Sequence, residues 1–250
     1  MARTENRQLG YVGNLGDIIK HAALVELSLL LARGRSKVSF VDTHAFQLHA
    51  PLPDRARWES DVDTLASRHS AYGTYAALEH ASLALTGHYR CSSGLMLDVL
   101  GDRRASAVLG EANAASRAEL TSQLAAEDVA KRTNVLLAHD AAAVDRESTI
   151  PAGGALLVHV DPFALSLETW STFAPALHSM AARSAETVMV LYRYSRNART
   201  PWPDARADLV TLVAETRGGP HEVCALASPD IADSVRGVCG ALGWTLTRSH

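Results

Sequence analysis

Several features that mark other protein classes are missing from this chain of 250 residues. It has only three cysteines, Cys91, Cys224 and Cys239, and an odd, widely separated set provides neither a disulfide framework nor the paired spacing of a zinc site. No apolar run approaches the roughly 20 residues that a membrane span needs. The polar residues 2–8 do not form a signal peptide. We therefore expect a soluble, cytoplasmic protein with no metal site.

An excess of positive charge is also lacking. The formal net charge is -3 at pH 7, whereas nucleic-acid-binding domains are usually strongly basic. This net charge does not exclude a local cluster of basic residues on the surface. Hydrophobic residues make up 47% of the chain, which at this length suits one α/β domain over residues 1–250 with a full core.

Apolar segments of strand length alternate with segments of helical periodicity along the chain. The periodicity predicts an N-terminal helix over 14–33 and a crossover helix that opens at Ser92 with serine as its N-cap. Further helices are predicted over 114–130, 167–182 and 204–216. Seven strands are predicted, at 38–42, 106–109, 134–138, 157–160, 187–192, 222–227 and 241–247. This alternation is typical of an α/β fold with a mainly parallel sheet.

The segment 51–89 interrupts the alternation. Pro51 and Pro53 break the chain, and the residues that follow are helix-like and rich in aromatic side chains. We expect a helical insertion subdomain directly after the first strand. It would serve as a lid, as a substrate-binding element or only as a structural addition.

Acidic residues follow each of the first four predicted strands, at Asp42, Glu111, Asp140 and Asp161. The carboxyl ends of parallel strands share one edge of the sheet, where ligands bind in open α/β folds. Neighbouring carboxylates repel one another unless a ligand or cation organises them. A cofactor with a ribose, an exocyclic amine and a positive centre would do so, and S-adenosylmethionine (SAM) has all three. The predicted strand order is that of the Rossmann-like class I SAM-dependent methyltransferases.

A phosphate-binding loop is not expected after the first strand. Residues 46–48 read Phe-Gln-Leu, and close approach of the backbone to phosphate needs glycine.

Two N-terminal motifs resemble those of a known family. Residues 13–21 read Gly-Asn-Leu-Gly-Asp-Ile-Ile-Lys-His and residues 42–45 read Asp-Thr-His-Ala. Both are similar to the RlmJ-like family of bacterial large-subunit ribosomal RNA adenine-N6 methyltransferases, which also has a helical insertion after the second motif and an Asp-Pro-Pro-Tyr motif. The similarity extends in order over nearly the whole chain.

The resemblance implies roles for individual residues. Asp161 would face the methyl group and Lys20 would lie beside the pocket, so both are candidate catalytic residues. Tyr11 and Phe163 would lie on the substrate side, with Tyr192 as a further candidate. The residues implied to bind SAM are His21, His44, Ser93, Glu111, Asp140, Ala141 and Asp161.

The chain departs from the family pattern at three places. Residues 161–164 read Asp-Pro-Phe-Ala instead of Asp-Pro-Pro-Tyr, which shifts the aromatic ring by one position in a turn. Residues 6–8 lack the family's Tyr-Arg-His, and residues 46–48 replace glycines. We therefore expect a SAM-dependent methyltransferase that modifies a nitrogen or oxygen of a small-molecule acceptor. Its catalysis would depend mainly on the proximity and orientation of the acceptor and the methyl group.

Three alternatives follow from the same residues. Adenine-N6 methylation of ribosomal RNA predicts a basic face, formed by Arg55, Arg57, Arg193, Arg196 and Arg199. A SAM-using enzyme of another type would catalyse an intramolecular displacement or an elimination. A protein that kept the fold without catalysis would bind a cofactor or partner only.

Overall fold

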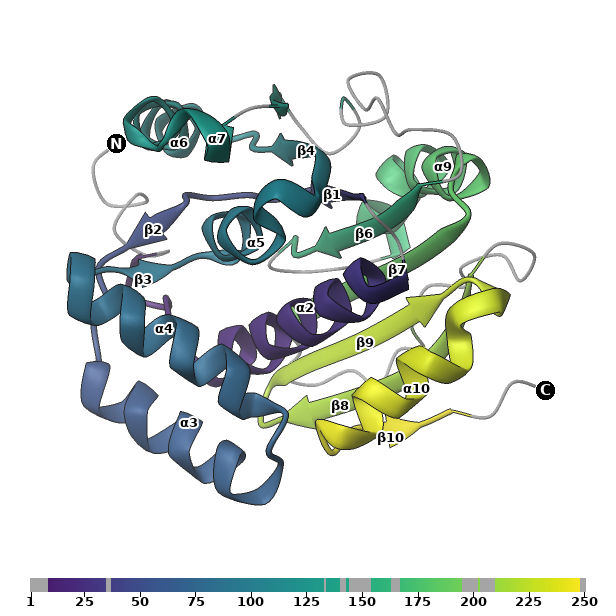
Figure 1. Cartoon of the computed structure of the whole chain (residues 1–250), viewed down its shortest axis with the longest axis horizontal. Helices are drawn as coiled ribbons and strands as arrows, with labels where there is room; N and C mark the ends of the chain where they lie inside the picture. The colour runs from purple at the N-terminus through teal and green to yellow at the C-terminus, as the bar shows by residue number, and fades with distance from the viewer. Residues whose placement is uncertain are drawn as a thin grey trace.

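The computed structural model describes residues 9–34, 37–132, 134–139, 143, 154–162, 167–194, 202 and 210–247. Its main sheet has eight strands in the order β10-β8-β9-β7-β6-β1-β4-β5 (Figure 1). The strands are β1 (Val38–Asp42), β4 (Arg104–Gly110), β5 (Val135–Ala138), β6 (Ala155–Val160), β7 (Glu186–Tyr194), β8 (Thr211–Gly218), β9 (His221–Ala227) and β10 (Thr245–Leu246).

Strand direction identifies the fold class. Strands β5, β4, β1, β6 and β7 are parallel, whereas β9 runs antiparallel to both β7 and β8. A seven-stranded sheet with one reversed strand next to its edge is the Rossmann-like fold of the class I methyltransferases, as the sequence predicts. The two-residue strand β10 extends this sheet beyond β8.

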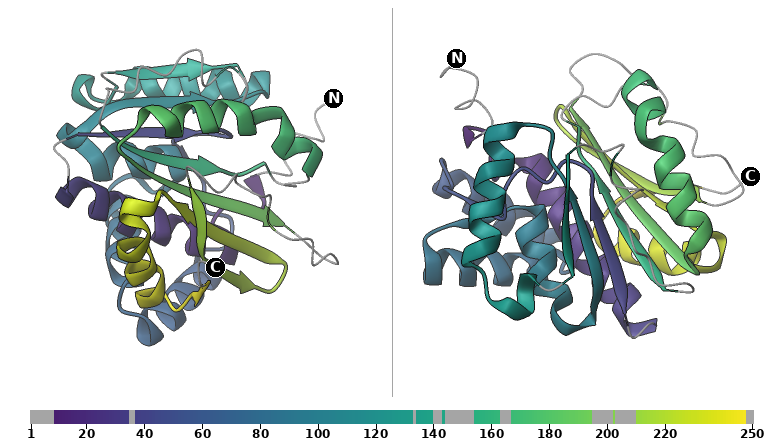
Figure 2. Two further views of the ribbon diagram at one scale, coloured as in Figure 1. Left: turned by 90° about the vertical axis from the view of Figure 1, so that its right-hand side faces the viewer. Right: turned by 90° about the horizontal axis from the view of Figure 1, so that it is seen from above.

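Helices cover both faces of the sheet (Figure 2). Helices α2 (Leu15–Gly34), α5 (Ser92–Leu100), α6 (Ala114–Ala126) and α10 (Ala232–Ala241) pack on one face, and α9 (Leu167–Arg183) packs on the other. A short helix α7 (Val129–Arg132) follows α6. Successive side chains of a strand point to opposite faces of the sheet. Phe40 and Leu157 therefore belong to the larger core, on the side of α2, and Val41 and Val158 belong to the smaller core, on the side of α9. No helix in the described ranges is long and apolar enough to cross a membrane.

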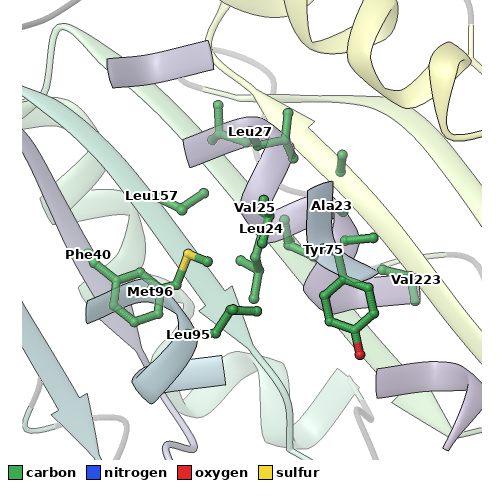
Figure 3. Packing of buried hydrophobic residues seen from close by; sticks show 14 of the residues in the cluster. Ala23, Leu24, Val25, Leu27, Phe40, Tyr75, Leu95, Met96, Leu157 and Val223 are labelled. Carbon is green, nitrogen blue, oxygen red and sulfur yellow. The ribbon is translucent and has the colours of Figure 1, made fainter. Parts of the chain in front are cut away.

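Helix α2 lies at the centre of the larger core. Its residues Ala23, Leu24, Val25 and Leu27 pack beside side chains of the sheet and of α5 (Figure 3). The helix begins where Asn14 caps it, because Asn14 Oδ1 accepts hydrogen bonds from the backbone N–H groups of residues 16 (2.7 Å) and 17 (3.2 Å). The cap and the apolar face together fix the position of the polar residues in its first turns.

The segment 51–89 forms two helices, α3 (Arg55–Arg68) and α4 (Tyr72–Thr86), as the sequence predicts. They lie between the paired two-residue strands β2 (His49–Ala50) and β3 (Tyr89–Arg90). Trp58 and Tyr75 are fully buried and belong to the same core as α2. The helices therefore pack on the main body through aromatic side chains.

Three sequence predictions of local structure are wrong. The helix predicted over 204–216 conflicts with β8, which begins at Thr211, and 204–209 lie outside the described residues. The turn Gly219-Pro220 joins β8 to β9 as a hairpin, and this pairing with β9 outweighs the local helical pattern. The strand predicted over 241–247 is limited to Thr245–Leu246, because α10 continues to Ala241.

The third error concerns the start of α5. Its N-cap is Cys91, and no side chain caps the helix. Ser92 and Ser93 are its first two residues, and their hydroxyls donate to Asp42 Oδ2 at 2.7 and 2.9 Å instead. The two hydroxyl groups therefore donate to the buried carboxylate of Asp42 and do not cap the helix, whereas the sequence predicts a serine cap.

Candidate active site

A pocket lies at the carboxyl ends of the parallel strands. Its cavity volume is about 290 Å³. It is lined by Tyr11, Val12, Asn14, Asp17, Lys20, His21, His44, Phe46, Tyr89, Cys91, Ser92, Glu111, Asp161, Pro162, Tyr192, Tyr194 and His221. Most of the residues singled out from the sequence thus meet in one place. Asp140, Ala141 and Phe163 lie outside the described residues.

Lys20 lies between two carboxylates of the pocket. Its ammonium group is 2.7 Å from Asp17 Oδ1 and also contacts Asp161 Oδ2, and it stands 4.7 Å from the ring centroid of Tyr192. Burial by itself lowers the pKa of Lys20, but Asp161 and Asp17 outweigh it and raise the pKa above its ordinary value. Lys20 therefore stays charged and holds the catalytic candidate Asp161 in place.

His21 is the neighbour of Lys20 on α2 and is also buried. Its Nδ1 atom lies 2.9 Å from the hydroxyl oxygen of Tyr89. Burial, and next the charge of Lys20, lower the pKa of His21 well below its ordinary value. The imidazole is therefore neutral at physiological pH.

Asp42 does not line the pocket itself but contacts residues that do, His44 and Ser92. The side chain is fully buried, and its Oδ1 atom accepts from the backbone N–H of His44 at 3.2 Å and lies 3.2 Å from His159 Nδ1. Burial raises the pKa of Asp42, but His159, Ser92 and Ser93 together lower it below its ordinary value. Ser93 is also fully buried and is not one of the lining residues, so its hydroxyl serves Asp42 rather than the pocket wall.

Glu111 follows β4 and lines the pocket as a half-buried carboxyl group. Its Oε1 atom accepts from the backbone N–H of Asn113 at 2.6 Å, and burial raises its pKa. His44 follows β1, where burial lowers its pKa. Both side chains lie where the sheet topology brings ligands.

Phe46 has a backbone conformation that is unusual for its side chain. Its φ angle is 46°, in the left-handed region that favours glycine. The resemblance places glycines in this loop, whereas this chain has a bulky side chain at a position whose φ angle favours glycine. The ring of Phe46 now lines the pocket.

Tyr194 and His221 also line the pocket beside Tyr192, and the sequence did not identify these two residues. The Tyr192 hydroxyl lies 2.9 Å from His221 Nδ1, and the ring of Tyr194 meets that of His221 edge to face at 5.4 Å. His221 comes from β9, whose pairing with β7 no local signal reveals. Asp17 could have been found, because it lies one helical turn before Lys20 in the same motif.

The arginines proposed for an RNA-binding face do not form one among the described residues. Arg193 is buried, donates to Glu222 Oε2 at 2.6 Å and has its guanidinium 4.1 Å from the ring centroid of Trp202. Arg55 and Arg57 pair with acidic residues one turn away on α3. Arg196 and Arg199 lie outside the described residues.

No metal site accompanies the pocket in the described part of the chain. No cluster of His, Cys, Asp and Glu there is arranged to hold a metal ion.

Neither a protein-family model nor a curated protein sequence matches the chain. Among solved structures, protein LPL1258 from Legionella pneumophila str. Philadelphia 1, with the family description DUF519, superposes with a TM-score of 0.67 and 13% identity. The match covers 95% of this chain and 98% of that chain. At this identity the likeness shows a shared fold over nearly the whole length, and the RlmJ-like relationship stays a resemblance.

Two further structures match more weakly. An rRNA methylase from Streptococcus thermophilus has a TM-score of 0.45 and 10% identity over 83% of this chain and 95% of that one. The N-methyltransferase NodS from Bradyrhizobium japonicum WM9 has a TM-score of 0.45 and 9% identity over 86% of this chain and 98% of that one.

Proposed function

We propose that the chain is a SAM-dependent methyltransferase and that SAM binds in the pocket described above. One observation carries the proposal: the fold is that of the class I methyltransferases, and its pocket lies at the carboxyl ends of β1, β4 and β6. In doubly wound folds an acidic residue after the second strand accepts hydrogen bonds from ribose hydroxyls. Glu111 occupies this position.

The charge of the pocket fits such a ligand. Its lining residues include three carboxyl groups, Asp17, Glu111 and Asp161, but only one ammonium group, Lys20. The pKa values of His21 and His44 are lowered, chiefly by burial, so these rings add no positive charge at neutral pH. An excess of negative charge favours a ligand that carries a sulfonium.

Glu111 would hold the ribose, and His21 and His44 would contact the amino-acid end of the cofactor. When bound, SAM would supply an electrophilic methyl group. Lys20 contacts Oδ2 of Asp161, which leaves Oδ1 to accept a hydrogen bond from an N–H or O–H group of the acceptor. Asp161 would thereby orient the attacking atom or take its proton. Catalysis would come mainly from proximity and orientation.

A small molecule is the acceptor that the pocket favours. Tyr192, Tyr194 and His221 line the pocket together with Tyr11, which is 54% exposed. Arg193 is buried in an ion pair, and the net charge of the chain is -3, so neither favours a polyanionic substrate. Adenine-N6 methylation of RNA is the alternative, and the two N-terminal motifs are what favours it.

Cofactor binding is tested by calorimetric titration with SAM and with S-adenosylhomocysteine (SAH). We expect micromolar binding to the wild type and at least about tenfold weaker binding to Glu111→Ala, because two hydrogen bonds to the ribose are lost. Asp63→Asn is the matched control, since Asp63 is an exposed acid on α3. The absence of heat with either ligand would overturn the proposal.

The acceptor is tested with SAM labelled in its methyl group. The labelled cofactor and the enzyme are incubated separately with a small-molecule extract and with deproteinised ribosomal RNA. We expect label in the small-molecule fraction with the wild type and none with Asp161→Asn. Label in the RNA alone would favour the alternative instead.

A further inference from the structure

A chain of buried hydrogen bonds runs from the helical insertion to the pocket. Trp58 Nε1 on α3 lies 3.2 Å from the hydroxyl oxygen of Tyr75 on α4. That oxygen lies 2.9 Å from the hydroxyl of Tyr89 in β3, which in turn lies 2.9 Å from His21 Nδ1 on α2. Trp58, Tyr75 and Tyr89 are at most 1% exposed. We call these three residues the aromatic relay.

The direction of the relay is fixed at its outer end. An indole N–H can only donate, so Tyr75 accepts from Trp58 and must donate its own proton elsewhere. Tyr89 is the only acceptor for that proton within the part of the chain that the structure describes. The Tyr89 hydroxyl therefore keeps its own proton to donate, and His21 Nδ1 lies 2.9 Å from its oxygen. The opposite direction would leave the Tyr75 hydroxyl proton buried without a partner, which is costly.

We infer that the aromatic relay fixes His21 as the neutral tautomer with its proton on Nε2. With Nδ1 occupied as an acceptor, the other ring nitrogen becomes an N–H donor at the pocket wall. The relay residues are thus positioning residues for His21. Trp58 and Tyr75 act through His21 because they do not line the pocket, whereas Tyr89 both contacts His21 and lines the pocket.

Ring packing holds the imidazole in the same place. The rings of His21 and Tyr89 stack with centroids 5.8 Å apart at 23°, and Tyr75 meets His21 edge to face at 6.3 Å. Burial and the adjacent Lys20 lower the pKa of His21 and so keep the ring neutral, as a single-proton tautomer requires.

A fixed N–H donor in the pocket selects an acceptor atom on the ligand. A carboxylate or carbonyl oxygen satisfies it, whereas an ammonium group does not. The assignment of this donor to the carboxylate of SAM rests on the proposed function. The tautomer itself follows from the relay alone and can be measured without any ligand.

The experiment is a long-range ¹H–¹⁵N correlation spectrum of the full chain labelled with ¹⁵N-histidine, and His21→Gln identifies the His21 signals by their loss. We expect a neutral ring with the acceptor-type nitrogen at Nδ1 and the protonated nitrogen at Nε2. Tyr89→Phe removes the donor to Nδ1, so the His21 signals should shift toward tautomer exchange. Tyr75→Phe should produce a smaller shift. Tyr72→Phe is the matched control, because Tyr72 is a buried tyrosine of α4 outside the relay.

A proton on Nδ1, an imidazolium, or equal spectra for Tyr89→Phe and Tyr72→Phe would each overturn the inference. Titration with SAM then tests the proposed function separately from the inference about the His21 tautomer. We expect Tyr89→Phe to bind SAM about fivefold more weakly than Tyr72→Phe does, with circular dichroism unchanged. The expected tautomer without any SAM binding would support the relay and contradict the proposed function. SAM binding by a chain in which the His21 proton is on Nδ1 would support the proposed function and contradict the relay.

Discussion

Lys20 shows how a single residue links folding to function. Its ammonium group is almost fully buried between Asp17 and Asp161, and both carboxylates line the pocket. Buried charges are tolerated only where they are paired, so each member of this cluster depends on the other two. The sequence places Lys20 and Asp161 at one site through separate arguments. Asp17, which lies one helical turn before Lys20, completes the cluster.

Lys20→Met tests the cluster directly. The substitution leaves two neighbouring carboxylates without a counterion, so we expect a loss of about 3 kcal/mol in the free energy of unfolding. Lys37→Met removes an exposed lysine and should cost less than about 0.5 kcal/mol. Urea unfolding measures both. Equal losses for the two variants would contradict the role of Lys20.

Glu79 provides a prediction about pH. This residue of α4 is fully buried, its Oε2 atom accepts from the backbone N–H of Arg90 at 3.0 Å, and its Oε1 atom has no hydrogen-bond partner among the described residues. Burial raises the pKa of Glu79 to about 8, against 4.5 for the ordinary group. The folded chain therefore binds a proton that the unfolded chain releases between these values.

The sign of the effect follows from this difference. The contribution of Glu79 to stability is fully present below pH 4.5 and is lost as the pH rises toward 8. Glu79→Gln removes this titration. We expect the variant to gain melting temperature relative to the wild type as the pH is raised from 5 to 8.5. A constant difference across this range would contradict the prediction, and Asp63→Asn is the control.

At the scale of elements, local patterns predicted the segments that are apolar and buried along most of their length. Helix α2 and strands β1 and β6 have strong patterns of apolar residues and were predicted close to their observed bounds. Strand β8 was mistaken for part of a helix because its partner β9 decides its conformation. The hydroxyls of Ser92 and Ser93 were misassigned for a similar reason, since their acceptor, Asp42, lies 50 and 51 residues earlier in the sequence.

Helix α5 approaches the loop after β1 so closely that only glycine fits at position 94. A Cβ atom there would lie 2.1 Å from the backbone oxygen of Leu48, which also accepts from Cys91 N at 2.9 Å. We expect Gly94→Ala to displace α5 from this loop and to destabilise the fold by about 3 kcal/mol. The measurement is chemical denaturation.

Gly237→Ala is the matched control for that experiment. Gly237 lies inside helix α10, and a Cβ atom there meets nothing within 4 Å. Alanine should therefore stabilise the protein by up to about 1 kcal/mol. A similar change in stability for the two variants would contradict the close approach at Gly94.

At the scale of the whole molecule, the pocket is assembled from segments far apart in the sequence. Helix α2, the segments after β1, β4 and β6, and the β7–β9 pair all contribute side chains to it. The sheet topology brings the carboxyl ends of the parallel strands together, and this part could be predicted from the sequence. Tyr192 was a candidate from the sequence, but its contact with His221 depends on the antiparallel pairing of β7 with β9, which the sequence does not encode locally.

The relay gives the insertion a connection to the same pocket. Helices α3 and α4 contribute no lining residue in the described ranges, but Trp58 and Tyr75 connect them to His21 through Tyr89. The insertion therefore contributes to the pocket, through the relay, as well as to the hydrophobic core. Its proposed role is to orient a side chain that contacts the ligand.

A crystal structure of the full chain grown with SAH would test directly whether this pocket binds the cofactor. We expect difference density in the pocket, with the ribose hydroxyls within hydrogen-bond distance of Glu111 and the sulfur on the side of Asp161. Density for SAH at another site, or a pocket occupied only by solvent at a saturating concentration of SAH, would show that this pocket is not the cofactor site.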